Sequence, residues 1–188
     1  MMKRLLLVAI CAMLSWNMSQ AQTALYSEDF NGCALPAGWS TVITSGVDDW
    51  QVSIGSSNPG NIDGTCMAWF DDDDIGSGAA FSTVEVYSPF YDLTSLVSAT
   101  VRFDYNYRHL GSAFLVDVWD KATSSWVNLL NETANNCGVW TCTNKPSFSQ
   151  AISPYLSDSV QIRFTYDDGD AWAWYMGFDN FDIVYFPP

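Results

Sequence analysis

Oxygen-bearing side chains gather at two places in the sequence where they could bind a hard cation. Asp179 and Asn180 lie inside the aromatic stretch 172–185, just after Gly177, which permits a β-bulge or a close backbone approach. Residues 71–74 are four consecutive aspartates. Carboxylate and amide oxygens are the ligands that Ca²⁺ takes. Either place could therefore hold calcium, while a turn-forming pair and a solvated acidic loop are the alternatives.

The run of aspartates is expected to be a loop, because four like charges in sequence should not lie in a core. It lacks the alternating acids, central glycine and distal glutamate of an EF-hand. If the backbone is extended there, Asp71 and Asp73 point to the same side. These two residues are our candidates for further calcium ligands.

Tryptophan could bind a ligand by stacking on a sugar ring, and the chain has nine tryptophans. Trp140 is expected at the tip of a loop over residues 135–146, and Trp172 and Trp174 begin the last aromatic stretch. We predict these three as ligand-binding residues. Packing of Trp140 against the end of the domain is the alternative.

The residues do not form a recognisable catalytic motif. His109 is the only histidine, no Ser or Cys motif surrounds it, and G-x-S-x-G is absent. With 21 acidic residues, some pair at the separation that a glycosidase needs arises by abundance alone. We therefore predict that the protein is not an enzyme, and an acid-pair glycosidase is the less favoured alternative.

Five cysteines are present, and Cys11 falls inside an apolar N-terminal run. The other four allow three disulfide pairings. Cys137 and Cys142 are close enough to close a small loop, which leaves Cys33 with Cys66. A zinc site is the rival interpretation, but the C-x4-C spacing has no second matching pair and only one histidine is available.

Residues 1–21 have the layout of a secretory signal peptide, with Lys3 and Arg4 before an apolar run that ends at Leu14. No other stretch approaches the roughly 20 apolar residues of a membrane-spanning helix. Residues 22–188 are then one secreted domain, with five basic against 21 acidic side chains and a formal net charge of −16. Such a charge argues against nucleic acid as a partner and is compatible with bound cations.

The elements that must position these residues are strands. Apolar residues alternate most clearly over 101–108, where Val101, Phe103, Tyr105 and Tyr107 share one face. No window outside the leader carries a capped helical period. We predict an all-β sandwich with strands over residues 25–30, 50–54, 66–70, 81–87, 101–108, 114–119, 126–130, 148–152 and 160–166, closed by the region 172–185.

Several short motifs follow one another over the whole mature chain: Phe30-Asn-Gly-Cys-Ala-Leu-Pro-Ala-Gly-Trp39, Ser88-Pro89 with Asp92-Leu-Thr, Val101-Arg-Phe-Asp-Tyr105, Val160-Gln-Ile-Arg-Phe164, Trp172, and Phe178-Asp-Asn-Phe-Asp-Ile183. In this order they resemble the cleaved-adhesin or choice-of-anchor J family of bacterial surface and secreted proteins, which is similar to eukaryotic MAM domains.

The resemblance implies a jelly-roll sandwich of the galactose-binding type, an extracellular binding or adhesion role, and structural Ca²⁺ near the first and last strands. The acidic positions of the family fall on Glu28 and Asn31 at the start, and on Asp179 and Asn180 at the end. Two of these four are amides, whose oxygens still ligate calcium. The predicted metal ligands are therefore Glu28, Asn31, Asp71, Asp73 and Asp179.

Together these features predict a secreted, noncatalytic module that recognises carbohydrate or protein on a cell or matrix surface, stabilised by calcium. A structural subunit of a surface assembly is the alternative, and the location could be the periplasm, the cell surface or the medium.

Overall fold

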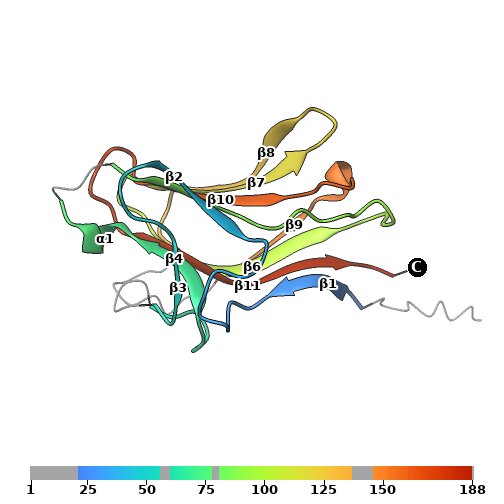
Figure 1. The fold of residues 1–188 in the computed structure, drawn as a ribbon, viewed down its shortest axis with the longest axis horizontal. Coiled ribbons are helices and arrows are strands. Elements are labelled where there is room, and N and C mark those ends of the chain that lie inside the picture. Colours follow the sequence, from blue (N-terminus) through green and yellow to red (C-terminus); the bar gives the residue numbers. More distant parts are fainter. Residues whose placement is uncertain (1–20, 56–59, 78–80, 137–145, 188) are drawn as a thin grey trace, which may run out of the picture.

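The computed structural model describes residues 21–55, 60–77, 81–136 and 146–187. Its strands form two antiparallel sheets that lie face to face (Figure 1). The six-stranded sheet contains β1 (Thr23–Glu28), β3 (Gln51–Ser53), β4 (Met67–Asp71), β6 (Thr100–Arg108), β9 (Ser147–Ala151) and β11 (Tyr175–Tyr185). The five-stranded sheet contains β2 (Ser40–Ser45), β5 (Thr83–Tyr87), β7 (Ala113–Asp120), β8 (Ser125–Glu132) and β10 (Ile162–Asp167). The all-β sandwich predicted from the sequence is confirmed.

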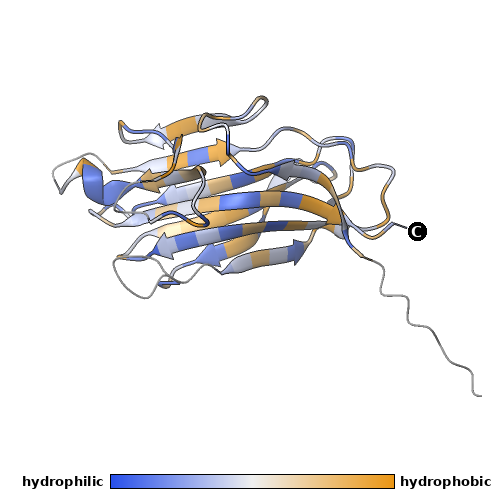
Figure 2. Ribbon diagram, turned by 90° about the horizontal axis from the view of Figure 1, so that it is seen from below, coloured by the Kyte–Doolittle hydropathy of each residue, from blue (hydrophilic) through white to orange (hydrophobic). Residues whose placement is uncertain are grey.

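The strand order places β11 and β10 at the centres of their sheets. The orders are β3-β4-β11-β6-β9, with β1 also paired to β11, and β2-β5-β10-β7-β8. The rings of Phe164 in β10 and Phe178 in β11 stack between the sheets, with centroids 3.9 Å apart. Hydrophilic and hydrophobic residues alternate along the strands of the six-stranded sheet (Figure 2), as expected for strands with one face in a core. The last strand region therefore does complete the core.

One strand was missed in the sequence. β2 is the edge strand of its sheet, and five of its six residues are exposed. Since neither of its faces is covered, the run Thr41-Val42-Ile43-Thr44 shows no alternation between apolar and polar residues.

The prediction of a loop over residues 71–74 is wrong. Asp71 ends β4, and residues Asp72–Ile75 form one helical turn, α1. Asp71 and Asp72 are only 7% and 4% exposed. The backbone N–H of Ala173 donates to the Asp72 carboxylate at 2.7 Å, and the Asp72 N–H donates to the carbonyl of Trp174 at 2.8 Å. Hydrogen bonds from a distant segment thus let an acid be buried, which a local rule about like charges does not foresee.

Of the helices in the described ranges, none is long and apolar enough to cross a bilayer. The only other helical segment there is the short 3-10 turn Ser153–Tyr155.

Cys33 and Cys66 form a disulfide with a Cα–Cα distance of 5.3 Å, which confirms that predicted pairing. The bond ties the loop after β1 to the residue before β4, on the same side of β11. Cys137, Cys142 and Trp140 lie outside the described residues.

Replacing both Cys33 and Cys66 by Ser should lower the free energy of unfolding by about 3 kcal/mol, because the crosslink restricts the unfolded chain over a 33-residue separation. Denaturant unfolding of the variant and the parent, both in non-reducing buffer, measures the difference. A midpoint within error of the parent would contradict a stabilising role for this bond.

Candidate functional site

A row of side chains crosses the outer face of the five-stranded sheet. In the strand register, Tyr87 of β5 is opposite Arg163 of β10, Arg163 is opposite Asp117 of β7, and Asp117 is opposite Asn128 of β8. The next residues along these strands, such as Val86 and Phe164, point into the core. The row therefore belongs to the face that the core does not use.

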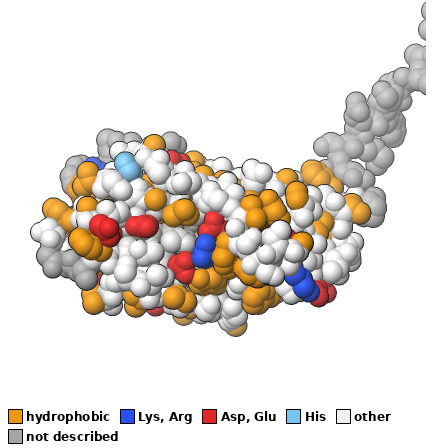
Figure 3. Space-filling model, turned by 90° about the horizontal axis from the view of Figure 1, so that it is seen from above, with side chains coloured by type: hydrophobic (Ala, Val, Ile, Leu, Met, Phe, Trp, Pro, Cys, Tyr) orange, Lys and Arg blue, Asp and Glu red, His pale blue; other side chains and the backbone are white. Residues whose placement is uncertain are grey.

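Arg163 is held in the middle of this row by two carboxylates. Its Nη1 donates to Glu85 at 3.0 Å, and its Nη2 and Nε donate to one Asp117 oxygen at 2.8 and 3.2 Å. Figure 3 shows a basic side chain flanked by acidic ones near the middle of this face, with hydrophobic side chains around them. The guanidinium is thus fixed in one orientation.

One aromatic ring, that of Trp126, contacts the guanidinium, and two further aromatic side chains pack against Trp126. The Arg163 guanidinium lies over the ring of Trp126, 4.6 Å from the centroid. Trp126 also contacts Trp119, with centroids 5.4 Å apart, and Tyr87, with centroids 5.7 Å apart. All three aromatic residues are partly exposed. Together these side chains form a flat, partly apolar surface with fixed polar groups at its centre.

One hydroxyl group completes this face, which we call the Arg163 face: Tyr87, Glu85, Asp117, Trp119, Trp126 and Arg163. The Tyr87 hydroxyl donates to Glu85. Burial, and to a lesser extent this hydrogen bond, raises the pKa of Tyr87, so the hydroxyl stays protonated. The Thr165 hydroxyl is buried beneath this face and makes no hydrogen bond within the described chain. Such a face can stack on the apolar side of a sugar ring and bond its hydroxyl groups.

Sequence reasoning missed Trp119 and Trp126 as site residues, although a signal was present. Val116 and Val118 face the core, so Trp119, one residue out of phase with them, has to face outward. Trp126 pairs with Trp119 across the β7–β8 hairpin. The strand period alone could have placed both on the outer face.

The structure places the predicted tryptophans elsewhere. Trp172 and Trp174 lie at the end of the sandwich, just before β11, with ring centroids 6.4 Å apart. Trp172 is 48% exposed. Trp174 lies under the guanidinium of Arg108, 4.4 Å from its ring centroid.

Asp179 is fully buried at a β-bulge in β11, where the register with β6 shifts between Asp179 and Asp182. One of its oxygens accepts the N–H of Asn180 at 2.7 Å, and the other, Oδ2, makes no hydrogen bond within the described chain. The pKa of Asp179 is raised from 3.8 to about 7, chiefly by burial; the Asn180 N–H acts in the opposite direction, and the charges of Asp63, Asp29 and Asp104 add to the rise. The structure therefore gathers several acids around a buried carboxylate.

The other predicted metal ligands are arranged differently. Glu28 is opposite Phe181 in the register and accepts the N–H of Phe30 at 2.8 Å, while Asn31 is exposed.

Asp71 is opposite Tyr175, at the far end of β11 from the bulge. Asp73 lies in α1, so the extended backbone that would align it with Asp71 is not present. Within the described ranges, no three His, Cys, Asp or Glu side chains are grouped to hold a metal alone.

His109 lies at the end of the sandwich, just after β6. Its Nδ1 is 2.9 Å from the Ser112 carbonyl oxygen and 3.2 Å from the Tyr107 hydroxyl. The Tyr107 hydroxyl in turn is 2.9 Å from the Ser112 hydroxyl. These contacts hold the end of β6 against the start of β7.

No family model matches the chain, and no curated protein matches it significantly. Among solved structures, it resembles the K1 cleaved adhesin domain of Lys-gingipain from Porphyromonas gingivalis W83, with a TM-score of 0.63, 16% identity, and coverage of 87% of this chain and 97% of that one. It also resembles TmCBM27, a carbohydrate-binding module with specific mannan recognition, with a TM-score of 0.55, 10% identity, and coverage of 87% and 98%.

A third similar structure is TmCBM61 in complex with β-1,4-galactotriose, with a TM-score of 0.54, 12% identity, and coverage of 82% of this chain and 92% of that one. At these identities the likeness concerns the fold. The chain therefore has the fold of the cleaved adhesin domains, which confirms at that level the resemblance stated from its motifs.

Proposed function

We propose that the protein is a secreted, noncatalytic module that binds a glycan on the Arg163 face. The observation that supports this is the guanidinium of Arg163, fixed by Glu85 and Asp117 and lying over Trp126, with further aromatic rings around it. Aromatic rings beside a few oriented polar groups are typical of sites for small polar ligands. The similar folds of an adhesin domain and two carbohydrate-binding modules support this class of function.

The charge of the Arg163 face favours a neutral glycan. One guanidinium is matched by two carboxylates, so the centre of the face carries a net negative charge. The whole mature chain, with its formal charge of −16, would also repel sulfated or uronic-acid chains. We propose a neutral polysaccharide or glycoprotein glycan as the ligand. Export of the chain is supported by the Cys33–Cys66 disulfide, since such bonds persist in oxidising compartments.

An array of glycans and extracellular-matrix proteins, probed with labelled protein in calcium and in chelator, tests this function. Binding to a set of neutral glycans that share a linkage or terminal sugar is expected. Binding only to matrix proteins stripped of their glycans would contradict it.

A structural subunit of a surface assembly is the second candidate, and the observation that favours it is the edge of the five-stranded sheet. β2 has no charged residue, and Val42 and Ile43 are 45% and 41% exposed. An uncharged, exposed edge can pair with another strand. Sedimentation of the protein at increasing concentration, beside an Ile43→Lys variant, tests this: assembly through β2 would be concentration-dependent and absent in the variant.

We also propose that calcium binds at Asp179. The site fits a hard cation because the unpartnered Asp179 Oδ2 is buried and Asp63, Asp29 and Asp104 act on it electrostatically. Asn180 donates its amide N–H groups to Asp63 and Asp104 at 3.2 and 3.1 Å, which holds these acids near the bulge. Amide or main-chain oxygens would have to complete the coordination. A bound cation would stabilise the charge that burial disfavours.

A further inference from the structure

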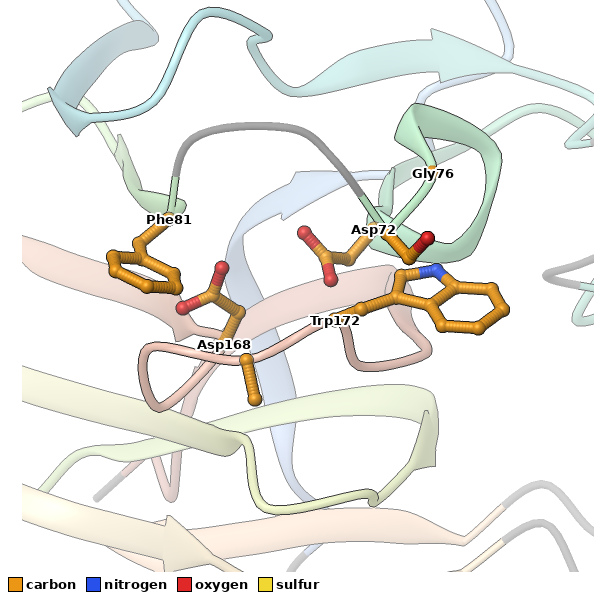
Figure 4. Close-up of a pocket in the computed structure, with 7 residues that line it drawn as sticks. Asp72, Gly76, Phe81, Asp168 and Trp172 are labelled. Carbon is orange, nitrogen blue, oxygen red and sulfur yellow. The ribbon is translucent and has the colours of Figure 1, made fainter.

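Two aspartates face each other at one end of the sandwich, away from the Arg163 face. Asp72 comes from α1 and Asp168 from the turn that follows β10, and their carboxylates point toward one another (Figure 4). Asp72 accepts the N–H of Ala173 at 2.7 Å, and Asp168 accepts the N–H groups of Ser82 and Asp170 at 2.6 and 2.9 Å. These bonds from the backbone fix both side chains in the facing arrangement.

This pair has no cationic partner among the described side chains. Ion pairs in the described ranges involve other acids, among them Asp182, Asp158, Glu85 and Asp117. Burial raises the pKa of Asp72, the Ala173 N–H lowers it, and Asp168 raises it again. Two buried carboxylates that repel each other are stabilised when a cation binds between them.

The Ser82 hydroxyl lies beside the Asp72 carboxylate, next to the pocket. Ser82 is 1% exposed, and its Oγ makes no hydrogen bond of normal geometry within the described chain. It is nevertheless close enough to the Asp72 carboxylate to lower the pKa of that group. Besides donating its proton, the Ser82 oxygen can accept a hydrogen bond from a group that binds beside the two carboxylates.

Aromatic side chains form the rim of the pocket. Phe81 and Trp172 lie on either side of the two carboxylates (Figure 4) and are 53% and 48% exposed. The Trp172 Nε1–H donates to the Asp73 carbonyl at 3.4 Å, which orients the indole. Rings at such a rim attract a cation through their negative faces.

We propose that this pocket binds a primary ammonium group, namely the head of a lysine side chain on a protein partner. An ammonium has three donors on a compact head, enough to bond the carboxylates of Asp72 and Asp168 at once. The four-carbon stem of lysine can then pack between Phe81 and Trp172.

Size and donor number favour this ligand over others. The pocket has a volume of about 40 Å³, room for a small head group and not for a sugar ring. Calcium takes six to eight oxygens, whereas an ammonium needs only three acceptors, and the two carboxylates already accept three backbone N–H groups. This site is separate from the Arg163 face, so it would add protein recognition to glycan binding.

The test is a titration of the ¹⁵N-labelled protein with Nα-acetyl-lysine amide, followed by the indole N–H signal of Trp172. A saturable shift is expected at millimolar concentration. Nα-acetyl-norleucine amide, which keeps the stem and lacks the ammonium, should bind at least tenfold more weakly. The signals of Trp119 and Trp126 should stay in place, so the outcome is independent of that for the Arg163 face.

Asp72→Asn and Asp168→Asn should each weaken binding of the lysine compound at least tenfold. Asp74→Asn removes the same charge from an exposed neighbour and should leave the affinity unchanged. Equal responses to lysine and norleucine amides would overturn the proposal. A Trp172 shift produced by calcium chloride at lower concentration than by the lysine compound would also overturn it, in favour of a metal. Should a variant fail to fold, the comparison of the two amides on the parent protein still decides.

Discussion

Replacing Asp179 by Asn should stabilise the protein in chelator at pH 8, by up to about 4 kcal/mol in the free energy of unfolding. Asp179 is buried and has a pKa raised from 3.8 to about 7, so it is ionised at pH 8 although its surroundings disfavour the charge. Each pKa unit corresponds to about 1.36 kcal/mol. Asparagine keeps an oxygen to accept the Asn180 N–H and carries no charge.

The pH dependence of this effect has a definite sign. Because the pKa of Asp179 is higher in the folded than in the unfolded chain, its protonation favours folding. In chelator the parent and Asp179→Asn should therefore be nearly equal in stability near pH 4. The parent should become the weaker of the two as the pH rises toward 7, with little further change above that. Thermal melting at a series of pH values, with Asp74→Asn as the charge-matched control, measures this.

Calcium should close most of this gap. Binding to the folded parent at a hundredfold excess over the dissociation constant adds about 2.7 kcal/mol, and Asp179→Asn should lose most of this gain. A parent whose melting temperature is the same in millimolar calcium and in chelator would remove the metal from this account. An Asp179→Asn variant that is less stable than the parent in chelator at pH 8 would show that the buried carboxylate is satisfied without a metal.

Replacing Trp126 by Ala should weaken glycan binding at least tenfold, which corresponds to about 1.4 kcal/mol. Trp126 contacts Trp119, Tyr87 and the Arg163 guanidinium, so its loss removes the centre of the aromatic surface. Calorimetric titration with the best glycan from the array measures the affinity. Trp172→Ala, an exposed tryptophan at the end of the sandwich, is the matched control and should bind as the parent does.

Arg163→Lys is a second variant for the same face. Lysine keeps the charge but cannot bond Glu85 and Asp117 at once in the fixed fork, nor stack on Trp126 in the same way. We expect a loss of affinity of similar size with the core strands intact. Unchanged affinity in both variants would move the glycan site away from the Arg163 face.

Most of the fold could be predicted because apolar alternation is strong wherever a strand has one face in the core. Val101 and Phe103 in β6 show this, as do Phe164 and Tyr166 in β10. The edge strand β2 gave no such signal, since most of its residues are exposed on both sides. The Cys33–Cys66 pairing followed from the other two cysteines being close in sequence, and the structure confirms it.

The candidate sites were harder to predict, because they depend on contacts between distant strands. Asp72 is buried because a backbone N–H of residue 173 reaches it, and Arg163 meets Glu85 and Asp117 only through the register of β5, β7 and β10. Trp172 and Trp174 stand out in the sequence because they begin an aromatic stretch. Trp119 and Trp126 lie in ordinary strand sequence; the strand period places them on the outer face, but the pairing of their rings depends on the register of the hairpin.

The most direct test of the central claim is an NMR titration of the ¹⁵N-labelled protein with the best glycan from the array, read at the tryptophan indole N–H signals. The account predicts saturable shifts for Trp119 and Trp126, and for the Nε–H of Arg163, with no change for Trp39 and Trp50 in the core. Saturable shifts confined to Trp172 and Trp174, with Trp119 and Trp126 unmoved, would contradict a glycan site on the Arg163 face.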